Sequence, residues 1–277
     1  RAVAVRQNNR GTGSTGVVNI CSGTLTLNAF TNDATLGRHW LNFNGGTVRA
    51  AANHSAFIPN TMTRVTVNGP FGAYAGGAVI DTAGKNVTVG APLQAPTGNG
   101  VREIILASKG SGYIGEPVVV IDGGGGEGAT AVANMEDDGT TNGTYRVASV
   151  TITNPGWNYT SAPTVAFVKG GNYVTAPTVG AVLLAPNSSA GLTKQGSGTL
   201  TLAAANTYTG STTVNGGTLQ LAHAAALPTG SEVILDGGNL DLGGYTVTNT
   251  LTVISGLITN GTLRTVLSPA GEGAIGV

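Results

Sequence analysis

The stretch that decides the fold lies between residues 191 and 221 and reads GLTKQGSGTLTLAAANTYTGSTTVNGGTLQL. It contains one phrase that recurs along the chain: a Gly, an alternating Thr-Leu-Thr-Leu run, a polar stretch, and then Asn-Gly-Gly-Thr leading into another alternating run. The same phrase occupies residues 22–48, and shorter echoes follow at residues 236–242 and 259–263. Internal repetition of this kind indicates a repeat architecture.

The alternating runs predict β-strands, because apolar residues at every second position face one side of a strand. The glycine pairs supply the positive φ angles that corners between strands require. Gly217 and Gly238 are 21 residues apart, and Gly238 and Gly261 are 23 residues apart. Short strands at regular spacing are also typical of a β-sandwich. The near-constant period instead favours a parallel β-helix, because one such unit cannot bury its own apolar face and must stack on the next.

This pattern predicts an all-β solenoid with one continuous core. The core should contain the apolar members of the alternating runs, which are Leu25, Leu27, Val48, Leu200, Leu202, Val214, Leu219, Leu221, Leu240, Leu242, Leu251, Val253 and Leu263. A shift of one residue in register would turn all of them toward solvent, so their burial tests the prediction directly.

The composition of the 277 residues excludes several classes of protein. Only 9% of the residues are charged, the formal net charge is 0, and 45 residues are Gly. No Lys/Arg cluster provides the basic surface of a nucleic-acid-binding protein, and no run of 18 apolar residues predicts a transmembrane helix. Gly, Thr, Val and Asn are poor helix formers. Cys21 is the single cysteine, and we expect it to be a small buried residue in a strand.

Residues 191–219 resemble the passenger-associated repeat of bacterial autotransporters. Residues 76–82 with residues 86–89 resemble the coil that usually precedes this repeat, and residues 267–276 resemble a coil found further along such passengers. The resemblance covers about two thirds of the chain. It implies a right-handed parallel β-helix that is secreted to the bacterial cell surface or the extracellular space, in a family whose members differ widely in activity. Because the chain starts at Arg1 without a Met and shows no signal peptide, we expect a mature or partial chain of a longer protein.

Residues 101–185 follow a different pattern and predict a small inserted β domain between the coils of residues 1–100 and those of residues 186–277. Three segments place a Tyr four residues before a Pro that opens a strand, at Tyr113, Tyr159 and Tyr173. Loops of a solenoid accept such growth because the stack itself is undisturbed. We expect this domain to be the recognition element of the chain and to fold separately from the coils.

Acidic residues concentrate in the predicted inserted domain and raise the question of a cation site. Asp122 and Glu127 flank a run of four glycines, and Glu136, Asp137 and Asp138 form an acidic turn. Carboxylate oxygens are ligands that calcium prefers, so these five residues make a calcium hypothesis, provided that the two loops meet. A solvated acidic turn is the simpler interpretation. The glycine run lacks the Gly-Lys-Ser/Thr and the following helix of a phosphate-binding loop, and we expect no other cofactor.

No arrangement of residues in the sequence predicts catalysis. The acidic residues of the coil segments each stand alone in their coil, and they are Asp33, Asp81, Glu232, Asp236, Asp241 and Glu272. The three histidines are His39, His54 and His223. They are far apart in the sequence, and none has a second His at metal-binding spacing. No Ser lies in a nucleophile-elbow motif. We therefore predict no catalytic residues and do not expect an enzyme.

Three functions follow in order of support. The first is an extracellular structural protein, a rigid rod that associates head to tail with copies of itself into a fibre or surface layer. A β-helix ends in an unpaired strand edge, and residues 2–5 and 273–277 carry no charge that would blunt it. The second is an adhesin or carbohydrate-binding module that uses the inserted domain to bind glycans or a host or neighbouring cell surface. The third and least supported is a polysaccharide-degrading enzyme, which would need paired carboxylates in a cleft.

Overall fold

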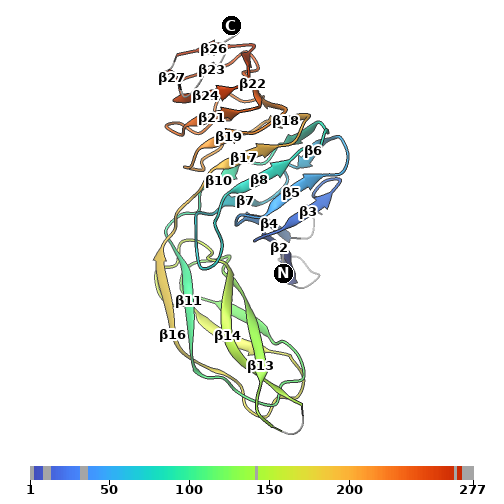
Figure 1. The fold of residues 1–277 in the computed structure, drawn as a ribbon. Helices are drawn as coiled ribbons and strands as arrows, with labels where there is room; N and C mark the ends of the chain where they lie inside the picture. The colour runs from blue at the N-terminus through green and yellow to red at the C-terminus, as the bar shows by residue number, and fades with distance from the viewer. Residues whose placement is uncertain (1–2, 9–13, 32–36, 141–142, 265–266, 270–277) are drawn as a thin grey trace. The chain divides into compact units, whose positions relative to one another are not determined.

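A computed structural model describes residues 3–8, 14–31, 37–140, 143–264 and 267–269 of the chain (Figure 1). All regular secondary structure within these residues is β-strand, and they contain no helix. This confirms the all-β prediction. The chain forms two compact units: unit 1 comprises Arg1–Pro70, Tyr74–Ala95 and Ser189–Val277, and unit 2 comprises Phe71–Ala73 and Pro96–Ser188.

The strands described in unit 1 form four sheets. In order across each sheet, sheet 1 is β1 (Val3–Asn8), β2 (Ser14–Ile20), β4 (Gly37–Phe43), β7 (Arg64–Val67) and β10 (Leu93–Gln94). Sheet 2 is β27 (Leu267–Pro269), β24 (Leu251–Ser255), β21 (Val233–Asp236), β19 (Thr212–Val214), β17 (Leu192–Gln195), β8 (Ala78–Asp81), β5 (Thr47–Ala50) and β3 (Thr24–Leu27). Sheet 3 is β25 (Ile258–Thr259), β22 (Asn239–Asp241), β20 (Thr218–Leu221), β18 (Thr199–Leu202), β9 (Val87–Val89) and β6 (His54–Ile58). Sheet 4 is β23 (Thr246–Val247) and β26 (Thr262–Leu263).

From β2 onward, consecutive strands of unit 1 fall in different sheets, and neighbours within a sheet come from successive coils. Strands β4, β5 and β6 lie in sheets 1, 2 and 3, and β7, β8 and β9 repeat the same circuit. Leu200 of β18 lies between Val87 of β9 and Leu219 of β20 in parallel register. Residues 96–188 enter the chain between β10 and β17, which is one step of this circuit. The arrangement is compatible with a parallel β-helix.

The apolar residues of the alternating runs form one core, as the sequence predicts. Ten of the thirteen predicted residues are buried members of a single cluster, and the other three, Leu25, Leu27 and Leu263, are partly buried and pack against it. In β18 and β20 the buried and half-buried positions alternate strictly. Because each inward leucine faces inward residues of the coils on both sides, burial and strand pairing stabilise the same register.

Buried asparagines close the corners of the first coils. The Asn68 amide donates to the Asn44 side-chain oxygen at 2.7 Å, and the Asn44 amide donates to the Cys21 sulfur at 3.6 Å. In sheet 1 the Asn42 amide donates to the Asn19 side-chain oxygen at 2.8 Å. Cys21 is free and buried, as expected, but it lies directly after β2 and not within a strand. These contacts satisfy polar groups that would otherwise destabilise the interior.

The first strand departs from the predicted pattern. The apolar segment at residues 2–5 falls largely in β1, which turns back antiparallel to β2 with Val5 opposite Val18. At this edge, sheet 1 therefore ends in an antiparallel strand and not in the parallel coil edge that was expected for head-to-tail association. Residues 273–277, as well as Asp33 and Glu272, lie outside the described residues.

The described residues of unit 2 form three antiparallel strand pairs. They are β11 (Asn99–Ser108) with β16 (Thr178–Pro186), β12 (Val118–Asp122) with β15 (Thr164–Val168), and β13 (Thr130–Asp137) with β14 (Tyr145–Asn154). The prolines of the three predicted Tyr-x3-Pro segments each stand directly before a strand, at Pro117, Pro163 and Pro177. Proline is tolerated there because no ladder donor is needed. The sequence placed the insertion at residues 101–185, and unit 2 extends beyond both bounds.

The two halves of unit 2 are related by an internal two-fold pseudosymmetry with an offset of 46 residues. Three backbone hydrogen bonds of one half recur in the other half. The symmetry relates β11 to β14 and β12 to β15. The bond from Val101 N to Pro155 O at 2.8 Å corresponds to the bond from Val147 N to Lys109 O at 3.0 Å. The bond from Gly115 N to Gly170 O at 3.1 Å corresponds to the bond from Ser161 N to Gly124 O at 3.2 Å. The bond from Tyr113 N to Tyr145 O at 2.9 Å corresponds to the bond from Tyr159 N to Asn99 O at 3.0 Å. Of the three Tyr-x3-Pro segments, the first two are thus equivalent and the third is additional.

The stacked core makes a first prediction about stability. Replacing the fully buried Leu240 by Ala should lower the free energy of unfolding by about 2–5 kcal/mol, because the truncation leaves a cavity between coils. Leu257→Ala is the matched control, since this side chain is 46% exposed and its loss should change stability by less than about 1 kcal/mol. Urea denaturation followed by circular dichroism measures both. Equal effects of the two substitutions would contradict the core assignment.

The division into units makes a second prediction. Deleting residues 96–188 and joining Ala95 to Ser189 should leave unit 1 folded. The join is short, because Gln94 lies opposite Thr66 and the Ser189 hydroxyl donates to the carbonyl of Val67, the next residue, at 2.8 Å. We expect a cooperative thermal transition and an unchanged β-type circular dichroism spectrum for the deletion variant. Loss of the cooperative transition would show that residues 96–188 complete the core of unit 1.

Candidate functional site

The structure separates the five acidic residues of the calcium hypothesis. Asp122 ends β12, and Glu127 precedes β13 on the Thr130 side, whereas Glu136 and Asp137 lie at the other end of β13, with Asp138 directly after it. At the usual rise per residue, the eight residues of β13 thus keep Glu127 roughly 20 Å from the acidic turn at residues 136–138. The two loops do not meet, so the condition for a five-residue calcium site is not met. Within the described residues no group of three or more His, Cys, Asp or Glu is arranged to hold a metal ion.

The acidic turn is engaged in structural contacts. The Glu136 carboxylate accepts from Lys109 at 2.8 Å and from Arg146 at 2.7 Å, and these contacts lower the pKa of Glu136. The Asp138 carboxylate accepts from the Thr144 hydroxyl at 2.7 Å and from the Gly112 N–H at 2.9 Å. Hydrogen bonds from Thr144, Thr140 and the backbone lower the pKa of Asp138 far below its ordinary value. Both carboxylates therefore hold neighbouring strands and turns together.

Three carboxylates of unit 1 also make structural contacts, whereas Asp236 is exposed at the end of β21. Asp81 lies 3.5 Å from the Arg49 guanidinium, and Glu232 accepts from the Thr252 hydroxyl at 2.6 Å. Asp241 accepts from the Gly243 N–H at 2.9 Å and from the Asn260 amide at 2.9 Å. None of these contacts pairs two carboxylates. His54 and His223 each accept from a backbone N–H two residues further along the chain.

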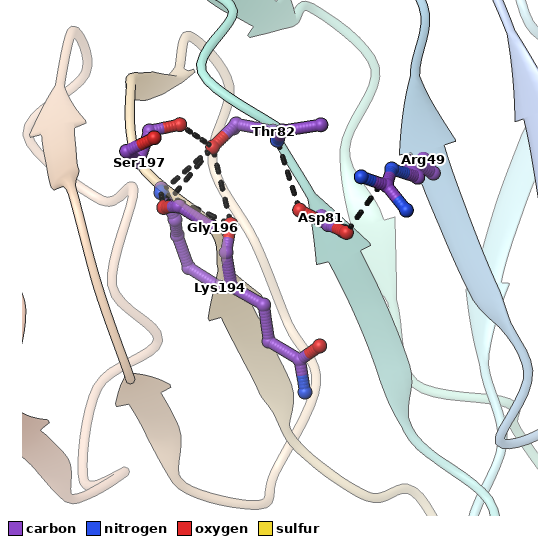
Figure 2. Close-up of polar contacts among 8 residues, drawn as sticks. Arg49, Asp81, Thr82, Lys194, Gly196 and Ser197 are labelled. Atoms are coloured by element: carbon purple, nitrogen blue, oxygen red, sulfur yellow. Dashed lines mark hydrogen bonds and ion pairs between the residues drawn. The ribbon is translucent and has the colours of Figure 1, made fainter.

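The most unusual polar group of unit 1 is Lys194, which is fully buried. Four oxygens share the three N–H donors of its ammonium: the Thr82 hydroxyl at 2.9 Å, the Gly216 carbonyl at 2.8 Å, the Gln195 carbonyl at 3.2 Å and the Gly196 carbonyl at 2.5 Å. Figure 2 shows Lys194 beside Thr82 and Gly196, with Ser197 completing the group. We call these residues the lysine cage.

The lysine cage joins three neighbouring coils. Lys194 belongs to β17, Thr82 directly follows β8, and Gly216 follows β19, and these three strands are adjacent in sheet 2. The Thr82 hydroxyl in turn donates to the Ser197 carbonyl at 2.7 Å. An ammonium has three donors and no acceptor, so a ring of carbonyl and hydroxyl oxygens is a suitable environment. The cage therefore satisfies corner carbonyls that point into the interior.

Two glycines make room for the cage. A Cβ on Gly217, whose φ is +62°, would lie 2.7 Å from the Lys194 nitrogen and 2.7 Å from the Gly196 carbonyl. A Cβ on Gly196, whose φ is +74°, would lie 2.7 Å from the Ala83 nitrogen. Each glycine combines a left-handed backbone with a close approach that a larger residue would block. The Asn-Gly-Gly-Thr phrase of the sequence thus has a steric reason at this corner.

Burial and nearby charge act against each other on Lys194. Burial lowers the pKa of the ammonium to about 8, and the negative charge of Asp81 acts in the opposite direction. Asp81 is itself paired with Arg49, as Figure 2 shows. At neutral pH the lysine is mostly protonated and donates to the cage. The chain itself covers the Lys194 ammonium completely, so the role that this site supports is to hold the backbone of the corner in place.

The sequence contains a signal for the lysine cage that was not recognised in the predictions above. In the run Leu192-Thr193-Lys194-Gln195 the alternation that turns Leu192 inward also turns Lys194 inward. A charged residue at an inward position predicts a buried polar contact, because an unpaired buried charge would be too unfavourable.

The shifted pKa of Lys194 makes a third prediction. Between about pH 8 and pH 10 the folded chain releases this proton while the unfolded chain, with a lysine pKa of about 10.4, retains it. The unfolded state then binds more protons, so the contribution of Lys194 to the free energy of unfolding should rise with pH by about 2 kcal/mol across this range. Urea denaturation at several pH values, comparing the chain with Lys194→Met, measures the contribution.

Comparison with the variant is necessary because burial raises the pKa of Cys21, which acts with the opposite sign in the same range. The Lys194→Met chain should also be less stable at pH 7, because the corner carbonyls lose their donor. Lys85→Met, on an adjacent turn and only half-buried, is the matched control. A difference between the chain and Lys194→Met that does not change with pH would contradict the burial of a titrating lysine.

Comparison with known proteins identifies one segment of the chain. Residues 192–221 match the family model of the passenger-associated-transport-repeat, and these residues run from the start of β17 to the end of β20 and include Lys194 and Gly217. No curated protein and no solved structure matches the chain. Among the described residues there is no helix that could cross a membrane. The chain therefore contains a repeat of autotransporter passengers, a family of secreted or cell-surface proteins.

Proposed function

We propose that the chain is part of an extracellular or cell-surface passenger whose unit 1 is a rigid, right-handed parallel β-helical rod. The observation that carries the proposal is the position of the passenger repeat at residues 192–221. Its strands continue the sheets on both sides in parallel register, with β17 on β8 and β19 on β21. A repeat that stacks on its neighbours in this way supports a solenoid in which each coil contacts only the next.

Side-chain ladders on the outer surface support a rigid rod with few charges. The Thr201 hydroxyl donates to Gln220 at 3.1 Å, the Gln220 amide donates to Asp241 at 3.0 Å, and the Asn260 amide donates to Asp241 at 2.9 Å. These contacts join four successive coils along sheet 3. Hydroxyl and amide groups thus link successive coils. They also keep the surface in contact with water, as charged residues do in most soluble proteins.

Head-to-tail association of rods is part of the same proposal. In the described part of the chain β3 is the outermost strand of sheet 2 and β6 is the outermost strand of sheet 3. Edge strands offer unpaired N–H and C=O groups to another chain. At the corresponding edge of sheet 1 the outermost strand, β1, is antiparallel, so association in continuous parallel register would use sheets 2 and 3. Contacts of this heterologous type extend into filaments unless the rotation between subunits closes them.

The location makes a fourth prediction. Antibodies raised against the 277-residue chain should label intact cells of the organism that produces it, or detect the chain in the culture medium. External protease should remove the label from unbroken cells. Antibodies against a cytoplasmic enzyme of the same cells are the control for leakage. A chain that is protected from protease until the cells are broken would contradict the proposal.

Association is tested separately by sedimentation velocity of the purified chain over a hundredfold range of concentration. Head-to-tail contacts should give a sedimentation coefficient that increases with concentration, and electron microscopy should show linear particles. A strictly monomeric species at every concentration and at physiological salt would reject association, and it would leave the proposal about location standing.

A further inference from the structure

One end of unit 2 lies away from the points where the chain enters and leaves this unit. In the pair of β11 and β16, Asn99 faces Pro186 beside these points, and Ser108 faces Thr178 at the opposite end. The loops that follow Ser108 and precede Thr178 meet there, because Ser111 forms a bridge with Thr175. We call the residues Ser111, Ile114, Tyr173, Val174 and Thr175, which belong to these loops, the remote end.

The remote end exposes large apolar side chains. Ile114 is 72% exposed, Val174 is 79% exposed and Tyr173 is 41% exposed. Side chains of this size are usually covered, and a group of them on one loop cluster indicates a binding surface. Loops held by a rigid sheet scaffold are also where binding residues most often lie.

The internal pseudosymmetry supplies a comparison for this surface. The counterpart of Ile114 at the other end of unit 2 is Thr160, and the counterpart of the loop at residues 171–175 is the loop at residues 125–129, which reads Gly-Gly-Glu-Gly-Ala. Two equivalent ends of one scaffold therefore carry different side chains. At the Ile114 position the fold does not require an apolar residue, because the Thr160 N–H donates to the Gly124 carbonyl as the Ile114 N–H donates to the Gly170 carbonyl. The two loops differ in their pairing as well, since Ser111 pairs with Thr175 at one end and Trp157 pairs with Glu127 at the other.

A tyrosine pair organises the remote end. The Tyr113 and Tyr173 rings stack with centroids 5.0 Å apart and an interplanar angle of 23°. Tyr113 is fully buried, and its hydroxyl has no hydrogen-bond partner among the described residues. Its counterpart Tyr159 receives a hydrogen bond from the Ala129 backbone. The stack holds one face of Tyr173 against the domain, so that the exposed part of the ring is presented in a fixed orientation.

The polar groups beside the tyrosine pair include two hydroxyls and two carboxylates that already have partners. The Ser111 and Thr175 hydroxyls lie 2.9 Å apart and are exposed to solvent. Glu136 is held between Lys109 and Arg146, and Asp138 is held by Thr144 and Gly112. Because these two carboxylates already have partners, the groups left for a ligand at the tyrosine pair itself are the exposed ring and the two hydroxyls, which suit a ligand that offers both C–H faces and hydroxyl groups. A neutral sugar has this combination.

We propose that the remote end of unit 2 binds neutral carbohydrate, with the Tyr173 ring as the stacking surface, Ile114 and Val174 at its sides, and the Ser111 and Thr175 hydroxyls as hydrogen-bonding groups. The proposal goes beyond the function proposed for unit 1 and does not depend on it. Rigid aromatic rings with adaptable hydroxyls beside them give contact area at a low entropic penalty.

The test uses the complete 277-residue chain on an array that contains neutral, sialylated and sulfated oligosaccharides. The chain should bind neutral oligosaccharides, and calorimetry with the best of them should show at least tenfold weaker binding for Tyr173→Ala. Ile114→Thr, which installs the residue of the symmetric position, should weaken binding about threefold. Tyr173→Phe keeps the ring and should bind within about twofold of the original chain.

Val120→Thr and Leu183→Thr are the matched controls, because these side chains are 40% and 44% exposed on strands of the same unit. Both should bind as the unchanged chain does. Absence of binding to every neutral oligosaccharide, binding of charged ones alone, or equal loss in the control variants would overturn the proposal. A dimer of the unchanged chain that Ile114→Thr dissociates would also overturn it, because a second copy would then occupy the surface.

Discussion

Backbone pairing between successive coils is the constraint on which unit 1 depends. Each short strand has too little apolar surface to be stable alone, so it must bond to the strands of the coils before and after it. These neighbours stand about 4.8 Å apart, and a slip of one residue would turn every leucine to solvent. The alternation of Thr and Leu in β18 and the close approach at Gly217 are both consequences of this constraint. Wherever the chain turns a corner, backbone groups leave the ladder and need other partners.

The corners of unit 1 meet this need with different side chains. In the first coils Asn44 and Asn68 bond to each other across the stack, and further along Asn206 donates to the Ala226 carbonyl at 2.6 Å and accepts from the Leu93 N–H at 2.8 Å. Between β8 and β19 the same task falls to Lys194, whose ammonium reaches three coils at once. A buried lysine is acceptable there because every donor has an oxygen partner.

Much of the fold of unit 1 was predictable from the sequence, and the polar sites were not. Strict alternation identified the core, because a period of two leaves each residue one of two faces, and Leu200 and Leu219 are buried as expected. Lys194 obeys the same rule, but a lysine is normally expected at the surface. The acidic residues Asp122 and Glu136 stand close in sequence, yet β13 separates them in space, and sequence spacing does not reveal which loops share an end. The sequence predicted only part of the symmetry of unit 2. It matched Tyr113 with Tyr159, which are equivalent in the structure, but it also grouped Tyr173 with them, and Tyr173 belongs to one end only.

The central claim is that the repeats stack as successive parallel coils in one register. The most direct measurement is disulfide formation between outward positions of β18 and β20 in a chain that carries Cys21→Ser. Thr201 lies opposite Gln220, so Thr201→Cys with Gln220→Cys places the two sulfurs within bonding range. Under mild oxidation, mass spectrometry should show a near-complete bond within the chain for this pair and free thiols for Thr201→Cys with Thr218→Cys, which stands two residues out of register. A bond in the second pair and none in the first would contradict the stacked arrangement.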